Sequence, residues 1–340
     1  MAKGKRTGIV FINVGTPDSP HPKAVGKYLR EFLMDPHVVD IPFLARWFLV
    51  HGLIVPRRSH QSAALYQKIW TPTGSPLLSH TLALAQKVQE KLADTHLVLP
   101  AMRYGNPSLR SAVEKFREAG ISELIAFPLY PQYSLAATHT SLEALRAWVK
   151  RLLPGVGFFK IPPFYSHPCY LDAVVQVSRP YLGKQDKVLF SFHGLPERQV
   201  KKTAPEKCFV SSSCCERVEN ANENCYRAQS FFTAREVAKR LGLEKNWEVG
   251  FQSRLGRTPW IQPFSDKLYE TLPQQGVKNL AVLTPSFVAD CLETLEEVQM
   301  RGEEAFRQAG GEKLVLVPSL NSHPAWVEAA TEILKTALPA

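Results

Sequence analysis

The feature that most constrains the fold is a regular alternation of short apolar, β-branched runs with amphipathic stretches of helical period. This alternation is typical of parallel sheets whose strands are joined by crossover helices. The runs predict eight strands, four in each half of the chain. The expected strands lie near residues 7–14, 97–103, 122–129, 156–161, 187–193, 247–252, 279–285 and 313–319. We therefore expect an α/β protein with two four-stranded parallel sheets flanked by helices.

The two halves also resemble each other. GIVFINVG in the first half matches KVLFSFHG in the second, and LPAMRYGNP matches GFQSRLGRTP. Since 340 residues exceed one typical core, we expect two similar Rossmann-like domains with the ligand cleft between them. The predicted domains are residues 1–165 and 166–320, divided near the prolines of 162–170. A C-terminal helix within 321–340 is expected to pack back on the first domain.

Composition limits the classes of ligand and partner that we expect this protein to bind. The net charge of +10 indicates an anionic ligand or an anionic lipid surface. Nucleic acid is not expected, because the chain has no basic tail, zinc finger or aromatic RNA-binding signature. The apolar run after MAKGKR has no small-residue cleavage site, so it predicts a first strand and not a signal peptide. We expect a cytoplasmic protein with reduced cysteines.

One segment resembles a membrane element. Residues 41–58, IPFLARWFLVHGLIVPRR, are bracketed by Pro42 and Pro56, interrupted by Arg46 and His51, and too short to span a bilayer. One interpretation is a helix in the core or at a domain edge. The other is an exposed apolar lid that covers an apolar ligand or contacts a lipid surface, peripheral to the inner membrane.

Polar side chains follow several predicted strands, at the edge where α/β sheets bind ligands. His193 ends one strand, and the following Gly-Leu-Pro turn exposes its side chain. Asp290, Glu293 and Glu297, at i, i+3 and i+7, would share one face of a helix. These groups can take protons and hold a divalent cation. A satisfied buried histidine and acids that only stabilise a helix dipole are the alternatives.

Other strand ends carry aromatic and basic side chains, and four cysteines lie close together. These side chains indicate a pocket for a flat aromatic ligand with acidic substituents. They are Arg103, Tyr104, Tyr130 and Trp260. The polar insertion 202–225 contains Cys208, Cys214, Cys215 and Cys225. In a reducing compartment this grouping is not expected to be a disulfide framework. Zinc, an iron–sulfur cluster and free thiols are the alternatives.

In order and spacing, the segments NVGTPDSP, RY, YPQYS, SFHGLPER, QSRLG with PW, and ADCLETLEE resemble the ferrochelatase family over nearly the whole chain. The resemblance implies a chelatase-like fold and a lyase of heme biosynthesis that inserts Fe(II) into protoporphyrin IX and releases two protons. It implies that His193 and Glu293 are catalytic and contact the substrate Fe(II). It further implies an acidic path through Asp290 and Glu297. Arg103, Tyr104, Tyr130 and Trp260 would then line the porphyrin pocket.

The resemblance has departures and extensions. Val14 stands where many members carry a Tyr or Met near the metal face, which favours protoporphyrin over coproporphyrin; coproporphyrin remains the alternative substrate. Cys291 replaces a histidine of the animal branch. Some members hold a [2Fe–2S] cluster in an insertion like 202–225, which implies such a cluster here. A handover from the preceding porphyrin-synthesis oxidase is also expected. The rival functions are a non-catalytic tetrapyrrole or metal carrier and a cobalt chelatase.

Overall fold

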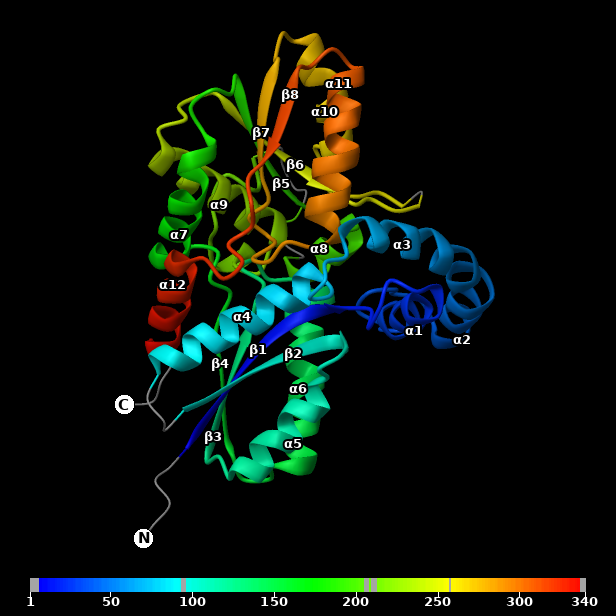
Figure 1. Cartoon of the computed structure of the whole chain (residues 1–340), viewed down its shortest axis with the longest axis vertical. Coiled ribbons are helices and arrows are strands. Elements are labelled where there is room, and N and C mark those ends of the chain that lie inside the picture. The colour runs from blue at the N-terminus through cyan, green and yellow to red at the C-terminus, as the bar shows by residue number, and fades with distance from the viewer. Residues whose placement is uncertain (1–5, 93–95, 205–207, 209–212, 257, 337–340) are drawn as a thin grey trace. The chain divides into compact units, whose positions relative to one another are not determined.

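The computed structural model describes residues 6–92, 96–204, 208, 213–256 and 258–336 (Figure 1). The chain divides into two compact units. The first comprises the residues up to Leu129, residues 135–162 and the segment from Thr331 onward. The second comprises Tyr130–Ser134 and Pro163–Ala330.

The first unit is built on a four-stranded parallel sheet in the order β2-β1-β3-β4. Its strands are β1 (Thr7–Thr16), β2 (His96–Gly105), β3 (Glu123–Pro128) and β4 (Gly157–Lys160). Its helices are α1 (Pro22–Leu33), α2 (Phe43–Phe48), α3 (Val55–Ile69), α4 (Pro76–Lys91), α5 (Leu109–Ala119) and α6 (Thr140–Leu152). Short π-helical segments cover Leu49–Ile54 and Leu135–His139.

Local sequence explains the position of β1 in this sheet and the packing and ends of α5. β1 is central because its middle residues, Ile9 to Ile12, form a continuous apolar run, and every residue of the strand except Val14 is buried. Val10 and Ile12 pack with residues of α5 and α6 in one core. Ser108 caps α5 by accepting a hydrogen bond from the Ser111 N–H at 3.1 Å, and Gly120 ends the helix with a left-handed φ of 64°.

The second unit repeats this plan with the strand order β6-β5-β7-β8, again all parallel. Its strands are β5 (Lys187–His193), β6 (Trp247–Gln252), β7 (Asn279–Leu283) and β8 (Lys313–Leu316). Its helices are α7 (Pro168–Ser178), α8 (Glu197–Thr203), α9 (Tyr226–Leu241), α10 (Ser265–Gln274), a π-helix (Glu293–Gly302) and α11 (Glu303–Gln308); α12 (Pro324–Lys335) follows. The equivalent orders confirm the prediction of two similar four-stranded parallel sheets.

The 41–58 segment forms an exposed helix that continues beyond the predicted end. Beyond residue 58, α3 carries the chain on to Ile69. Pro56 lies in the first turn of α3, directly after the π-helical segment, where its missing N–H is tolerated. The segment carries large apolar side chains that are 43–69% exposed, namely Phe43, Leu44, Trp47, Phe48 and Leu53. The interpretation as a core helix is therefore excluded.

Arg46 is the inward-facing residue of this helix. Its side chain is buried, and its Nη1 donates to the carbonyl oxygens of Val39 and Ile41 at 3.1 and 3.0 Å. The charge that seemed to interrupt the apolar run thus fixes α2 to the preceding loop and leaves the exposed face apolar. Within the described ranges, no helix combines the length and the apolar character needed to cross a bilayer.

Candidate active site

His193 is the last residue of β5, and its backbone is fixed on both sides. Its N–H donates to Ser286 Oγ at 3.2 Å. Its ring Nδ1 lies 2.6 Å from the carbonyl oxygen of Gly194. Because a carbonyl oxygen only accepts, Nδ1 carries the proton in this bond, and the lone pair of the neutral ring lies on Nε2. His193 can therefore accept a proton or bind a cation through Nε2.

The turn after His193 has no room for a larger residue than glycine. A Cβ on Gly194 would lie 2.7 Å from the carbonyl oxygen of Gln252 and 3.2 Å from the Trp260 ring. Trp260 is half-buried, and its Nε1 donates to the carbonyl oxygen of Leu255 at 2.9 Å. The structure thus brings Trp260 to the turn beside His193.

Glu297 is held at the end of β6 by a residue that the sequence did not indicate. The Ser253 N–H donates to Glu297 Oε1 at 2.8 Å, and the Ser253 hydroxyl donates to Oε2 at 2.5 Å. Ser253 adopts a left-handed φ of 64°, which is uncommon for a residue other than glycine. Its only sequence signal is its place after a strand end, equivalent to that of the RY pair in the first half.

Opposing effects act on the Glu297 carboxyl. Burial raises its pKa, and the nearby negative charge of Glu293 raises it further. The Ser253 hydrogen bond and the positive charge of protonated His193 lower it, but the net result is a raised pKa. His193, Glu293 and Glu297 therefore lie within electrostatic reach of one another in the second unit.

The acidic row does not lie on one α-helix. Glu293 begins a π-helix, and Asp290 precedes it. The Asp290 carboxylate accepts from the Thr294 hydroxyl at 3.1 Å, the Ser319 N–H at 3.2 Å and Asn321 Nδ2 at 2.7 Å. These contacts join the start of the π-helix to the segment after β8. The role of Asp290 in a cation or proton path stays a prediction.

The π-helix is fixed to the end of β6 through a buried glutamine. Gln252 Nε2 donates to the carbonyl oxygen of Glu293 at 2.8 Å and lies 3.4 Å from Glu297 Oε2. π-helical segments occur frequently at functional sites. Here the segment presents Glu293 and Glu297, four residues apart, from an element that is tied to the same strand edge as His193.

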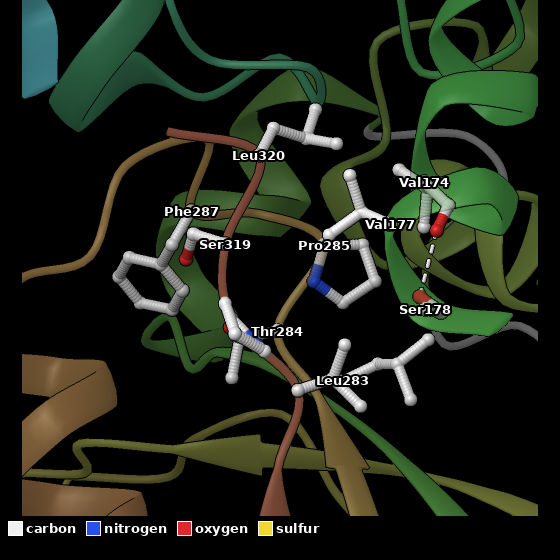
Figure 2. A pocket seen from close by; sticks show the side chains of 11 residues that line it. Val174, Val177, Ser178, Leu283, Thr284, Pro285, Phe287, Ser319 and Leu320 are labelled. Carbon is white, nitrogen blue, oxygen red and sulfur yellow. Dashed lines mark hydrogen bonds between the residues drawn. The ribbon is translucent and has the colours of Figure 1, made fainter. Parts of the chain in front are cut away.

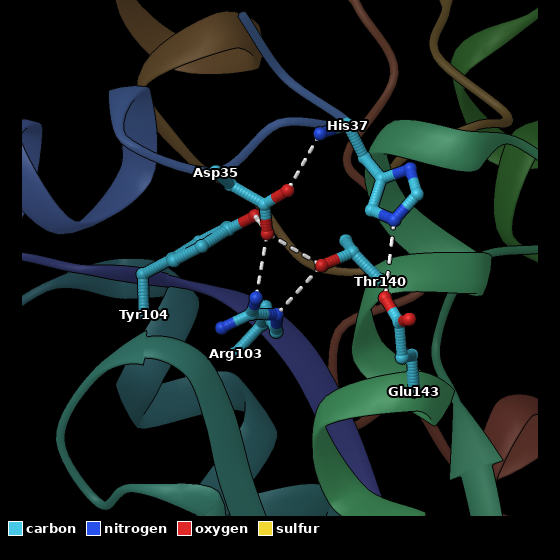
Figure 3. A network of polar contacts seen from close by, with 6 residues as sticks. All are labelled: Asp35, His37, Arg103, Tyr104, Thr140 and Glu143. Atoms are coloured by element: carbon cyan, nitrogen blue, oxygen red, sulfur yellow. Dashed lines mark hydrogen bonds and ion pairs between the residues drawn. The ribbon is translucent and has the colours of Figure 1, made fainter. Parts of the chain in front are cut away.

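In the first unit, Arg103 and Tyr104 meet at a buried carboxylate, Asp35 (Figure 3). Arg103 Nη2 lies 2.5 Å and the Tyr104 hydroxyl 2.8 Å from Asp35 Oδ2. Thr140 accepts from Arg103 Nε at 2.9 Å and donates to the same carboxylate oxygen at 2.5 Å. The His37 N–H donates to Asp35 Oδ1 at 2.7 Å.

This network fixes the protonation of its members. Burial alone would raise the pKa of Asp35, but the hydrogen bonds from Thr140, His37 and Tyr104 and the charge of Arg103 lower it overall. Burial raises the pKa of Tyr104, so its hydroxyl stays a donor. Tyr104 is only 1% exposed. Its predicted contact with a ligand stays a prediction.

Val14 and Tyr130 are the remaining predicted pocket residues. Val14 is half-buried at the end of β1, where its N–H donates to Asn13 Oδ1 at 2.9 Å. The next residue, Gly15, has a φ of 115°, and a Cβ there would lie 1.8 Å from the carbonyl oxygen of Tyr104. Tyr130 is half-buried and belongs to the second unit, as do His193 and Trp260.

A small cavity in the second unit is not the site of a large ligand (Figure 2). Its volume is about 20 Å³, and its lining includes Leu283, Thr284, Phe287 and Ser319. Within the described chain, the buried hydroxyls of Thr284 and Ser319 have no hydrogen-bond partner. The space suits one water molecule that would satisfy them. Phe287 separates this cavity from His193, with ring centroids 6.2 Å apart.

The thiols of the cysteine insertion gather in one place, although residues 205–207 and 209–212 lie outside the described part. Cys214 Sγ and Cys215 Sγ are 3.7 Å apart, and Cys215 also shares a hydrogen bond with Cys225. Burial and the neighbouring thiols of Cys214 and Cys215 raise the pKa of Cys208 to about 11. Arg227 Nη1 lies 3.0 Å from Cys215 Sγ. All six cysteines are described, and none forms a disulfide.

Comparisons with known proteins agree over the whole chain. Residues 6–338 match the family described as Ferrochelatase. A ferrochelatase of Coxiella burnetii is 45% identical, over 99% of this chain and 96% of its own length. One of Legionella pneumophila is 41% identical, over 97% of this chain and 98% of its own length.

Among solved structures, the fold resembles that of the sirohydrochlorin chelatase SirB from Bacillus subtilis subspecies spizizenii in complex with cobalt. That likeness has a TM-score of 0.54 at 10% identity and covers 98% of this chain and 95% of the other. SirB from Bacillus subtilis with Fe3+ gives a TM-score of 0.53, also at 10% identity, over 97% of this chain and 94% of the other. These likenesses concern the fold alone. The sequence matches extend over the segments that carry His193 and the π-helix, and the chain belongs to the ferrochelatase family.

Proposed function

We propose that this lyase inserts Fe(II) into protoporphyrin IX, forming protoheme and releasing the two pyrrole protons, in the last step of heme biosynthesis. The observation that carries the proposal is the pairing of His193, whose Nε2 holds the lone pair, with Glu297, whose pKa is raised. Removal of weakly acidic pyrrole protons requires a base and a second group that takes the proton on from it. The coproporphyrin alternative is not favoured.

The proposed role of each side chain in the reaction follows from its chemistry. His193 Nε2 accepts a pyrrole proton, and Glu297, whose pKa is raised mainly by burial, takes the proton on from the resulting imidazolium. Glu293, one turn earlier on the π-helix, supplies negative charge toward the incoming Fe(II). Binding of the large apolar macrocycle provides the energy that bends it and exposes its nitrogen lone pairs.

Four side chains are proposed to contact the porphyrin: Trp260, Tyr130, Val14 and Arg103. Trp260 offers a ring face beside the His193 turn, and Tyr130 and Val14 add apolar surface. Arg103, whose side chain is 20% exposed and lies over the Tyr104 ring, provides a positive charge for a propionate.

The experiment that tests this function compares wild type with His193→Ala under anaerobic conditions. Protoporphyrin IX and Fe(II) are mixed with the protein, and the loss of porphyrin fluorescence is followed. We expect turnover in the wild type, loss of turnover in the variant, and similar porphyrin affinity in both. Tight binding without turnover in either protein would favour a carrier, and turnover in the variant would remove His193 as the base.

We further propose that Cys208, Cys214, Cys215 and Cys225 hold a [2Fe–2S] cluster. The residues fit the group, because two thiolates on one tetrahedral metal lie about 3.8 Å apart, close to the 3.7 Å between Cys214 and Cys215. When bound, the cluster would supply redox chemistry and hold the insertion together. Visible absorption and about two irons per chain, lost in Cys214→Ser, would support it. A colourless protein with bound zinc would refute it.

The exposed apolar face of α2 is proposed to contact an anionic lipid surface. Phe43, Leu44 and Phe48 project from this helix, and exposed Arg57 and Arg58 follow in α3. Apolar insertion combined with adjacent basic charge is the usual composition of such contacts. Handover of the porphyrin from the preceding oxidase stays a prediction.

A further inference from the structure

Two histidines and a glutamate of the first unit form a cluster that the proposed reaction does not use. Their potential ligand atoms, from His37, His139 and Glu143, all lie within 4.8 Å of one another. His37 Nε2 is 3.1 Å from Glu143 Oε2 (Figure 3). The His37 and His139 rings meet edge to face with centroids 4.8 Å apart.

The three side chains come from two elements that sequence alone does not bring together. His37 lies in the loop after α1. His139 ends the short π-helical segment Leu135–His139, and Glu143 lies in the first turn of α6. His139 and Glu143 are thus four residues apart on one continuous helical stretch, the spacing at which two side chains point to the same side.

The backbone on both sides of the cluster is fixed by the same buried carboxylate. The His37 N–H donates to Asp35 Oδ1 at 2.7 Å, and Thr140, the residue after His139, donates to Asp35 Oδ2 at 2.5 Å. Asp35 is in turn held by Arg103 and Tyr104. Ligands positioned by such a supporting shell bind metal with less loss of side-chain freedom.

The donor set identifies the class of ion. Two imidazole nitrogens and one carboxylate suit Zn(II), Fe(II), Co(II) or Ni(II), whereas Mg(II) and Ca(II) prefer oxygen-only sites. Two ligands of a tetrahedral ion with bonds of about 2.0–2.1 Å lie about 3.3 Å apart. The 3.1 Å between His37 Nε2 and Glu143 Oε2 is close to this value. The ligand atom of His139 lies within 4.8 Å of the other two.

We propose that His37, His139 and Glu143 form a binding site for a divalent transition metal, with water in the remaining coordination positions. The site is open to solvent, since the side chains of His37 and Glu143 are 27% and 64% exposed. Its ion is therefore exchangeable. The ion would join the loop after α1 to α6 through three protein ligands.

Zn(II) binding to the full chain tests the proposal. The number and affinity of bound ions are measured by equilibrium dialysis for wild type, His139→Ala, Glu143→Gln and the control His60→Ala, which removes an exposed histidine of α3. The site predicts that wild type and His60→Ala bind one more equivalent than the other two variants, or bind that equivalent at least about 10-fold more tightly. Because Glu143 is exposed, Glu143→Gln tests the site even where His139→Ala fails to fold.

Outcomes of two kinds would overturn the site. Equal stoichiometry and affinity in all four proteins would show that His37 and Glu143 form only an ion pair. Loss of the equivalent in His60→Ala as well would show general surface binding. Porphyrin metallation is recorded in parallel. A variant that loses the Zn(II) equivalent but retains turnover separates this site from His193, so failure of either proposal leaves the other standing.

Discussion

The hydrogen bonds from Ser253 to Glu297 allow the proposed proton path to be tested at one atom. The hydroxyl and the N–H of Ser253 both donate to the Glu297 carboxylate, at 2.5 and 2.8 Å. Both bonds favour the ionised carboxylate and oppose the burial that raises its pKa. Ser253→Ala removes the hydroxyl bond and keeps the backbone bond. The pKa of Glu297 should therefore rise further.

The size of the change follows from the charge on the acceptor. A hydrogen bond to an ionised group contributes roughly 1.5–3 kcal/mol, and about 1.4 kcal/mol corresponds to one pKa unit. The lower end, about one unit, is expected because water can replace part of the lost bond. Glu297 can take a proton from His193 only when it is ionised, so activity falls as the pH drops through its pKa. The acidic limb of kcat/KM should shift upward by about one pH unit.

The assay is anaerobic Fe(II) insertion, measured by the loss of porphyrin fluorescence between about pH 5 and 9. Ser253→Gly is the matched control, since it also lacks the hydroxyl but adopts the φ of 64° without strain. Equal shifts in both variants would assign the effect to the hydroxyl. A shift in Ser253→Ala alone would indicate backbone strain. An acidic limb that stays in place in both would refute the relay role of Glu297.

Three other substitutions test the Asp35 network, the turn after His193 and the exposed face of α2. Asp35→Ala leaves the Arg103 guanidinium without its carboxylate, and urea unfolding should show a loss of about 3 kcal/mol; unchanged stability would contradict the network. Gly194→Ala places a Cβ 2.7 Å from the Gln252 carbonyl oxygen. This clash should lower the free energy of unfolding by about 1–3 kcal/mol and lower Tm. An unaltered Tm would show that the turn can widen. Phe48→Glu should abolish co-sedimentation with anionic vesicles without changing Tm, since Phe48 is 66% exposed; persistent sedimentation would place the contact elsewhere.

The strands could be predicted because their signal is local. Each buried strand reads as a short apolar run between turn residues, and all eight lie where these runs occur. The π-helical segments Leu49–Ile54, Leu135–His139 and Glu293–Gly302 were not predicted. Their wider hydrogen-bonding pattern has no compositional signature and depends on what surrounds the helix. The extension of the lid helix past residue 58 was missed for the same reason.

The partners of the site residues were harder to predict than the residues themselves. His193 could be singled out because it is a polar residue at the end of an apolar strand, and Glu293 because it belongs to a row of acidic residues beyond the next predicted strand. Asp35, by contrast, lies 68 residues from Arg103 and 105 from Thr140, so nothing near it in sequence shows that it will be buried between them. Ser253 likewise meets Glu297 across 44 residues. Such contacts arise from the order of the strands.

The repeated sheet explains why the proposed base lies in the second unit. β1 and β5 are both central, and each has at its end a glycine that cannot accept a Cβ: Gly15, the second-last residue of β1, lies against a carbonyl oxygen of β2, and Gly194, directly after β5, lies against one of β6. The residue before each glycine therefore occupies an equivalent strand-end position. That residue is Val14 in the first unit and His193 in the second. The backbone provides the same position twice, and the choice of side chain gives one an apolar group and the other an imidazole, which is the proposed base.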